Sequence, residues 1–230
     1  SQIASFGSQG AFLALNDMIE EHGFEIKKVF EEKGMEYVKS LITFPDGNIY
    51  AMPDINQCYH CSMAQKLWIY KPWLDTLGLE VPKTLEEYKE VLRAFKTQDP
   101  NGNGKNDEIP LAGATTGWFA RLPGFFMCSF IYCDNDTNMF IQDGKIDVSF
   151  NKPEWKEGLK YLNELYVEGL LSPETFTQDE DQYRQMGENP DIPILGSGVG
   201  GHQGVMAQFY GESGRWLDFV IVPPLQGPEG

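Results

Sequence analysis

The chain has no long hydrophobic run and few basic residues. No stretch approaches the roughly 18 to 20 consecutive apolar residues of a membrane span, and no charged-then-apolar leader opens the sequence. We therefore expect any export signal to have been removed or to lie outside these residues. Acidic residues number 34 against 18 lysines and arginines, which gives a formal charge of −16. Such a charge argues against nucleic acid, an anionic membrane surface or a polyanion as the partner.

Motifs of the common enzyme classes are also missing. The sequence has no nucleophile elbow and no phosphate-binding glycine loop, and its three histidines are His22, His60 and His202. Pairs of carboxylates occur, but 34 acidic residues produce some pairs by chance. A glycosidase would need two carboxyl groups that face each other across a groove. We therefore expect a protein that binds its ligand without chemical change and is not an enzyme.

Cysteine is scarce, and its spacing leaves several interpretations open. Cys58 and Cys61 have the two-residue gap of redox and zinc motifs, and Cys128 and Cys133 have a wider gap. A four-thiolate zinc site, a disulfide within a pair, or four reduced thiols would each fit.

Apolar residues make up 41% of the 230 residues, enough for a sizeable core, and expected strands alternate with expected helices. This order predicts an α/β fold. Thr84 and Glu87 have the spacing of a capping box, and Asn151 and Glu154 are expected to cap a later helix that contains Pro153. Other expected elements are helices within 11–39, around 73–77, after 172 and at 202–210, and strands at 41–44, 49–53, 67–70, 145–150, 192–195 and 217–222.

The segment from Asp99 to Pro110 is rich in oxygen-bearing side chains at alternate positions. It matches the first half of an EF-hand loop, with Gly104 at the sixth position, but Pro110 stands where an EF-hand has its bidentate Glu. A polar turn without an ion is the alternative. We predict a calcium site, and its ligands would come from Asp99, Asn101, Asn103, the Lys105 carbonyl, Asp107 and Glu108.

Several short motifs, in this order, resemble those of the extracellular solute-binding proteins of bacterial ABC transporters, family 1. They are 47–53 (GNIYAMP), 77–87 (LGLEVPKTLEE), the Asp/Asn loop, the glycine-rich run 196–204 and 219–224 (FVIVPP). One departure is 69–72 (IYKP), where many members have Tyr-Asn-Lys. The resemblance implies a periplasmic-binding-protein-like type II fold, in which two α/β lobes close on a ligand.

The resemblance also implies how the chain is divided and where it works. Residues 1–52 would be part of lobe 1, residues 53–195 a nearly complete lobe 2 with the calcium loop, and residues 196–230 the return crossing and more of lobe 1, so the chain would be a central fragment. The calcium would stabilise lobe 2 without contacting sugar. The protein would be extracytoplasmic, either a cell-surface lipoprotein or periplasmic, and would deliver a neutral or weakly charged saccharide or oligosaccharide to the ABC permease subunits in the membrane.

Aromatic and planar polar side chains are the usual means of holding sugar rings. Trp118 and Phe119 follow a Gly/Thr-rich stretch, which places them on a loop, whereas Trp155 and Phe95 lie on helical stripes and are assigned to the core. The expected ligand-binding residues are Asn56, Tyr59, His60, Trp118, Phe119, His202 and Gln203. Two rival functions are a binding protein for peptides or other polar solutes, and a zinc or redox protein that uses Cys58 and Cys61.

Overall fold

The computed structural model describes residues 2–56, 58–132, 134 and 137–228. It divides into two compact units, unit 1 (residues 1–58) and unit 2 (residues 59–230). The two units are described separately below. Cys133, one of the four cysteines, lies outside the described residues.

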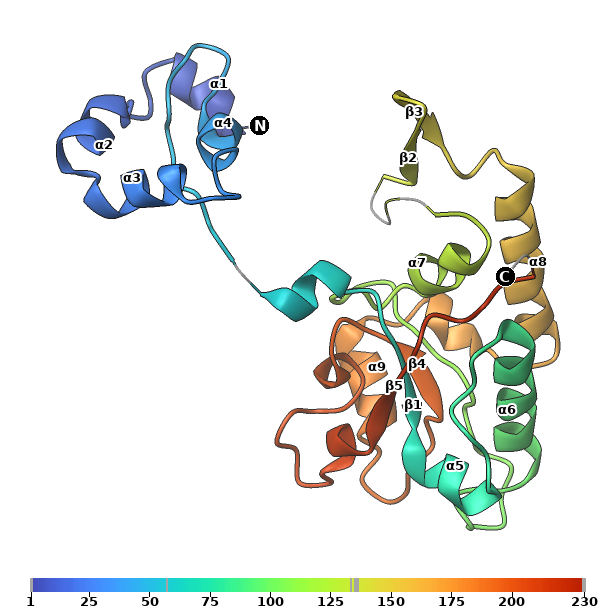
Figure 1. The fold of residues 1–230 in the computed structure, drawn as a ribbon. Coiled ribbons are helices and arrows are strands. Elements are labelled where there is room, and N and C mark those ends of the chain that lie inside the picture. Colours follow the sequence, from blue (N-terminus) through green and yellow to red (C-terminus); the bar gives the residue numbers. More distant parts are fainter. Residues whose placement is uncertain (1, 57, 133, 135–136, 229–230) are drawn as a thin grey trace. The chain divides into compact units, whose positions relative to one another are not determined.

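Unit 1 is built mainly from short helices (Figure 1). They are α1 (Gln2–Ser8), α2 (Asn16–His22), α3 (Phe24–Glu31) and α4 (Val38–Ile42). The strands expected at 41–44 and 49–53 are reduced to a single bridge between Thr43 and Ile49, closed by a turn in which Gly47 has a φ of +82°. The expectation of a strand at 41–44 was wrong in its first half, because α4 continues to Ile42.

Unit 2 is organised around a three-stranded antiparallel sheet in the order β4-β1-β5. The central strand β1 (Leu67–Tyr70) is buried along its whole length and pairs with β4 (Ser197–Val199) and β5 (Phe219–Val222). Trp68 lies opposite Gly198 on one side and Ile221 on the other. The sheet therefore joins segments from both ends of the unit.

This pairing differs from the expected division of the chain. Residues 196–230 were expected to cross back and join lobe 1, but β4 and β5 lie in the same sheet as β1, inside unit 2. The unit boundary also falls after Cys58, not after residue 52. The physical reason is that Leu67 and Ile69 are completely buried between the two neighbouring strands, so both neighbours belong to one core.

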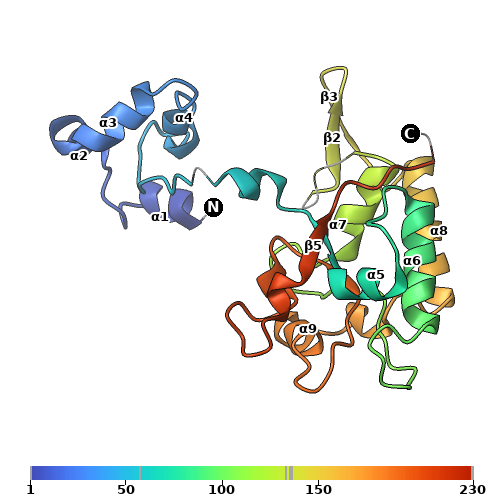
Figure 2. The same ribbon diagram turned by 60° about the horizontal axis from the view of Figure 1, so that its bottom comes forward.

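Helices flank the sheet on two sides, with α6 and α8 side by side and α9 on the other side (Figure 2). Ion pairs link α6 to α8, from Lys89 to Glu164 at 2.8 Å and from Arg93 to Glu168 at 2.7 Å. The α-helices of this unit are α5 (Lys71–Leu77), α6 (Leu85–Thr97), α7 (Leu122–Phe126), α8 (Pro153–Val167) and α9 (Glu180–Gly187). Short 3-10 helices are η1 (Tyr59–Met63), η2 (Met127–Ser129), η3 (Pro173–Phe176), η4 (Gln203–Val205) and η5 (Arg215–Leu217).

The predicted capping box of α6 is present. The Thr84 hydroxyl accepts a hydrogen bond from the Glu87 amide at 3.1 Å, and the Glu87 carboxylate accepts one from the Thr84 amide. The predicted cap of α8 was wrong, because Lys152 is the N-cap and makes no side-chain capping bond. Pro153 presets the helical φ of the first position, which places the cap on the residue before it.

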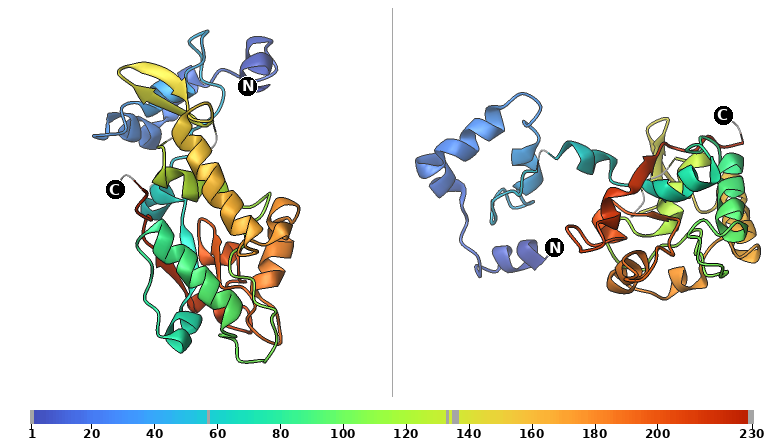
Figure 3. Two further views of the ribbon diagram at one scale, coloured as in Figure 1. Left: turned by 90° about the vertical axis from the view of Figure 1, so that its right-hand side faces the viewer. Right: turned by 90° about the horizontal axis from the view of Figure 1, so that it is seen from below.

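A two-stranded hairpin precedes α8 and stands at its N-terminal end (Figure 3). It consists of β2 (Met139–Gln142) and β3 (Lys145–Val148), joined at Asp143 and Gly144, which have φ values of +52° and +73°. These positive values fit a two-residue hairpin turn.

Two expectations in the glycine-rich region were wrong. The strand expected at 192–195 lies instead at Ser197–Val199, and the helix expected at 202–210 is only the single turn η4. Added Cβ atoms would lie 2.7 Å from Trp73 at Gly196 and 1.8 Å from Tyr183 at Gly198. The glycines therefore let this strand pack tightly against the core.

Candidate functional site

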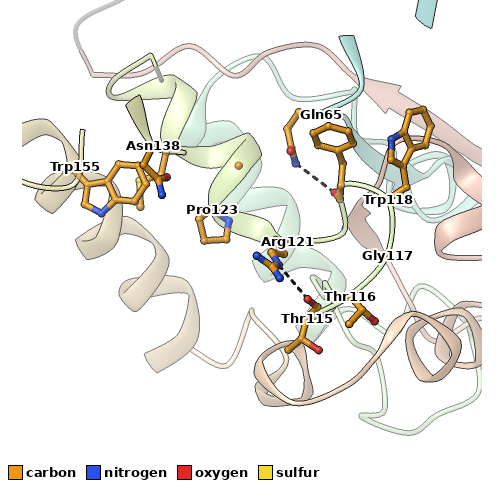
Figure 4. Close-up of a pocket in the computed structure, with 12 residues that line it drawn as sticks. Gln65, Thr115, Thr116, Gly117, Trp118, Arg121, Pro123, Asn138 and Trp155 are labelled. Carbon is orange, nitrogen blue, oxygen red and sulfur yellow. Dashed lines mark hydrogen bonds between the residues drawn. The ribbon is translucent and has the colours of Figure 1, made fainter. Parts of the chain in front are cut away.

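Unit 2 contains a cavity of about 840 Å³ that combines aromatic and polar side chains (Figure 4). Trp118 and Trp155 lie at opposite ends of the view, with Arg121 and Pro123 between them. The lining residues are Gln65, Thr115, Thr116, Gly117, Trp118, Phe119, Arg121, Pro123, Gly124, Met127, Asn138 and Trp155.

One wall is a loop that we call the Trp118 loop (residues 114–120). Its base is closed by a hydrogen bond from the Ala114 amide to the Ala120 carbonyl at 2.9 Å. Phe119 has a φ of +57°, an unusual value for a residue other than glycine, and its carbonyl accepts from Gln65 Nε2 at 3.4 Å. A strained residue of this kind persists only where its surroundings fix the conformation, so this loop is a candidate for function.

The glycine-rich segment after β4 supports the Trp118 loop from behind. The Gly201 amide donates to the Trp118 carbonyl at 2.8 Å, and a Cβ atom at Gly201 would lie 2.1 Å from the indole ring. Any larger residue at position 201 would displace the indole. Glycine at this position therefore has a specific role, which is to admit Trp118.

Two histidines flank the Trp118 ring. The ring centroid of Trp118 lies 5.7 Å from that of His60 and 5.3 Å from that of His202. His202 Nδ1 is buried and has no hydrogen-bond partner among the described residues, and burial lowers the pKa of this imidazole. We therefore treat His202 as neutral, with its ring packed against the indole of Trp118.

Lys66 connects the three segments that meet at this site. Its ammonium donates to the His60 carbonyl at 3.1 Å and to the Gly201 carbonyl at 3.0 Å, and it lies 5.8 Å from the centroid of the Trp118 ring. Burial lowers the pKa of Lys66. Its two carbonyl partners and the aromatic face compensate for the desolvated charge.

Of the expected ligand-binding residues, the structure brings together His60, Trp118, Phe119 and His202. Gln203 follows directly in η4 and is half-buried. Tyr59 is 82% exposed, and the Asn56 side chain, in unit 1, accepts a hydrogen bond from the Cys58 amide. Neither Asn56 nor Tyr59 lines the cavity.

Several lining residues were not predicted. Trp155 was assigned to the core, but it is half-buried and lines the cavity, whereas Phe95 is fully buried as expected. Trp155 lies in the first turn of α8, two residues after Pro153, and this position at a helix end was a signal that its side chain faces an opening. Gln65, Arg121 and Asn138 come from three separate segments, and the sequence gives no sign that they converge.

The predicted calcium loop folds tightly, with Asp99, Gly102 and Gly104 at positive φ. The Asp99 carboxylate accepts from the amides of Asn103 at 3.1 Å and Gly104 at 2.9 Å. The Asp107 carboxylate accepts from the side chains of Asn101 and Asn103, and these bonds lower the pKa of Asp107. Groups four to six positions apart therefore meet in one small loop.

Glu108 is the exception in this loop, because both of its carboxylate oxygens are buried and lack a hydrogen-bond partner among the described residues. Burial raises the pKa of Glu108, and the nearby charges of Asp107 and Asp99 raise it further. A buried carboxylate without a partner is costly, and a cation is the natural compensation. The donor set therefore fits a hard cation.

The cysteines contribute a third feature. Cys58 and Cys61 are disulfide-bonded, and Cys61 Sγ lies 3.9 Å from His60 Nε2. In this state neither sulfur is a thiolate, the form that binds zinc. The structure therefore favours the disulfide among the interpretations of this pair.

No helix in the described ranges is long and apolar enough to cross a membrane.

Comparison with known proteins identifies relatives of this chain. No family model matches it. It is 36% identical over 199 residues to the fructooligosaccharide ABC transporter substrate-binding protein FusA of Streptococcus pneumoniae. The matched region covers 84% of this chain and 36% of FusA. The fold is similar to that of FusA in complex with kestose, with a TM-score of 0.80 at 30% identity over 100% of this chain and 45% of the FusA chain.

Another similar structure is the alginate-binding protein AlgQ2 without calcium ion. It gives a TM-score of 0.73 at 25% identity and covers 100% of this chain and 45% of AlgQ2. An EF-hand mutant of FusA in complex with fructo-nystose gives a TM-score of 0.82 at 30% identity, again over 100% of this chain and 45% of the other. The chain thus spans less than half the length of these relatives.

Proposed function

Because the chain is homologous to the substrate-binding proteins of ABC transporters, we propose that the protein containing it is the solute-binding component of an ABC importer and binds an oligosaccharide. The observation that carries the proposal is the indole of Trp118, held at the edge of a cavity beside hydroxyl and amide side chains. Aromatic faces stack on the apolar faces of sugar rings, and planar polar groups fix the hydroxyls. No catalytic step is part of this function.

The wider setting follows from the same relatives. The protein would act outside the cytoplasm, as a cell-surface lipoprotein or in a periplasm, and would pass its ligand to the permease subunits of the transporter. The relatives are two-lobed. Residues 59–230 would form most of one lobe, because they have a complete core of their own, and residues 1–58 would belong to the other.

Calorimetric titration of the intact protein with a panel of oligosaccharides and oligopeptides tests this function. We expect at least one oligosaccharide to bind and the Trp118→Ala variant to bind it about tenfold or more weakly, since the stacking surface is lost. Trp118→Phe should retain part of the affinity. Tyr132→Ala removes an aromatic ring that is 79% exposed and outside the cavity, and serves as the control. Binding of peptides alone, or equal affinity in Trp118→Ala, would contradict the proposal.

For the loop at 99–108, we propose that it binds calcium as a structural ion. Oxygen ligands would come from Asp99, Asn101, Asn103, the Lys105 carbonyl, Asp107 and Glu108. The buried, unpartnered carboxylate of Glu108 supports this proposal over a polar turn without an ion. The ion would hold the loop in place and take no part in contacts with the ligand.

The calcium proposal has a direct test. Adding EDTA should lower the melting temperature and adding calcium should restore it, because the ion binds the native state only. Asp107→Asn should abolish the calcium-dependent increase. Asp143→Asn removes the same charge from the exposed hairpin turn, and this variant should keep the increase. A melting temperature that is the same in EDTA and in calcium would refute the site.

A further inference from the structure

Arg121 is the one charged side chain among the described residues that line the cavity. It precedes α7 and lies between Thr115 and Pro123 in the cavity wall (Figure 4). The chain as a whole carries a formal charge of −16, so a cationic cavity wall is not expected from composition. The local charge of the cavity is therefore opposite in sign to that of the molecule.

Among the described residues, the Arg121 guanidinium has a hydrogen-bond acceptor at one edge only. Arg121 Nε donates to the Thr115 carbonyl at 3.1 Å. Thr115 is itself fixed, because its amide and its hydroxyl both donate to the Gln178 carbonyl, at 2.9 and 2.8 Å. Gln178 is 5% exposed and donates in turn to the Gly113 carbonyl at 2.6 Å. This chain of bonds orients the guanidinium and leaves its two terminal amino groups for another acceptor.

No carboxylate of the described residues lies within ion-pair distance of Arg121, whereas Arg93 on α6 and Arg184 on α9 are each paired with carboxylates. Glu180 comes near the cavity at Gly117, but it is bound to Arg184 at the next turn of α9. A guanidinium presents its donors in a fixed, planar arrangement that matches both oxygens of a carboxylate. Arg121 is exposed, so water solvates its terminal amino groups, and a ligand carboxylate would replace that water.

We propose that the cavity binds an oligosaccharide that contains a uronic acid, with the sugar carboxylate on Arg121 and a pyranose face on Trp118. This inference rests on the proposed saccharide-binding function and narrows the ligand from oligosaccharides in general to those that contain a uronic acid. A uronic acid differs from the neutral or weakly charged saccharide expected in the sequence analysis, because a ligand responds to the charges nearest to it. Thr116, Asn138 and Gln65 provide hydroxyl and amide groups for the remaining sugar hydroxyls.

The test compares each acidic ligand with a neutral form of the same ring. Oligogalacturonates and alginate oligosaccharides are titrated into the intact protein together with their methyl esters, and kestose serves as a neutral oligosaccharide of another kind. We expect a free acid to bind about 10- to 100-fold more tightly than its ester, the range for a hydrogen-bonded charge. The affinity for the acid should also fall as salt is raised, whereas that for the ester should not.

Variants assign the effect to one residue. Arg121→Gln should remove the preference for the acid over its ester, and Arg121→Lys should retain part of it. Lys145→Gln removes the same charge from the exposed strand β3 and should leave both affinities unchanged. If neutral oligosaccharides bind as well as acids and Arg121→Gln changes nothing, the inference is overturned while saccharide binding stands. If no oligosaccharide binds at all, the proposed function itself fails.

Discussion

At the scale of single residues, the buried carboxylate of Glu108 gives the clearest prediction. Most of the acidic side chains meet water or a cation of the protein, but both oxygens of Glu108 are buried without a partner in the described part of the chain. Buried polar atoms in native proteins almost always have a hydrogen-bond partner, so this carboxylate needs an explanation. We expect it to lower stability without the proposed calcium ion and to contribute stability with it.

This double role gives a pH prediction. In the ion-free protein the pKa of Glu108 is raised above its unfolded value, so the native state prefers the protonated form. The stability that this preference provides is complete below the unfolded pKa and is lost as the pH rises through the folded pKa. In EDTA, Glu108→Gln should therefore melt at a higher temperature than the wild type at neutral pH. The difference should shrink as the pH falls through the raised folded pKa and should be gone below the unfolded pKa of about 4.3.

In calcium the sign should reverse, because Gln cannot supply a carboxylate to the ion. Differential scanning calorimetry of the variant and the wild type, in EDTA and in calcium and at neutral and acid pH, measures the melting temperature in each of the four conditions. The exposed Glu36→Gln variant is the control and should show neither effect. A Glu108→Gln protein that is less stable than the wild type in EDTA at neutral pH would contradict the burial argument.

At the scale of elements, several local signals were read correctly, whereas long-range packing was not. The strand at Leu67–Tyr70, the capping box of Thr84 and the helix around 73–77 depend on neighbours in the sequence, and each was predicted. The strand β4 was misplaced by several residues, because its glycines are selected by close contact with Trp73 and Tyr183 and not by strand propensity.

The residues of the candidate site were likewise predicted only where the signal was local in the sequence. Trp118 and Phe119 were expected to be on a loop from the composition of the preceding stretch, and the structure shows such a loop. Arg121, Asn138 and Trp155 were missed, because α7, the β2–β3 hairpin and α8 come together only in the folded chain. Residue type and spacing therefore predicted part of the site, while its charge required the structure.

Lys66 links three elements, and its substitution is a test of how they cooperate. Lys66→Met keeps the length of the side chain but leaves the carbonyls of His60 and Gly201 without their donor. The Trp118 loop should then be less ordered, and we expect oligosaccharide affinity to fall about tenfold or more, since two hydrogen bonds from a charged donor are lost. Calorimetric titration measures the affinity, and the change in tryptophan fluorescence on binding reports on Trp118.

Lys66→Arg, which keeps the charge, should recover part of the affinity and of the fluorescence change. Lys145→Met is the matched control on an exposed strand and should behave as the wild type. If Lys66→Met lowers the melting temperature but leaves both the affinity and the fluorescence change intact, Lys66 stabilises the fold without positioning the site.

At the scale of the whole molecule, the two units differ in how their apolar residues are buried. The contiguous core cluster runs from Leu67 to Leu225 and lies entirely in unit 2, where it includes the sheet, α5, α6 and α9. In unit 1, Ile19, Val38 and Ile49 are buried, but large apolar side chains such as Leu13, Phe24 and Leu41 are exposed by 70% or more. We therefore expect unit 2 to contain the independently stable part of this chain.

A truncated protein of residues 59–230 tests this division. It needs Cys61→Ser, because Cys58 is removed and Cys61 would otherwise be left as a reactive thiol. We expect one cooperative urea transition with retained near-ultraviolet circular dichroism, since the buried tryptophan Trp73 and its neighbour Phe95 keep their packing. The 1–230 chain with Cys61→Ser is the matched control. Loss of the near-ultraviolet signal in the truncated protein alone would show that unit 1 is required for the core.

The same truncated protein should keep its full response to calcium. All the expected ligands lie between residues 99 and 108, and the loop is tied to unit 2 by the Asn101 side chain, which donates to the Pro193 carbonyl at 3.4 Å. The next residue, Ile109, pairs with Leu195, so the loop is attached directly beside β4. The calcium-dependent increase in melting temperature should therefore be the same in 59–230 as in 1–230. A smaller increase in the truncated protein would mean that calcium stabilises more than the unit that binds it.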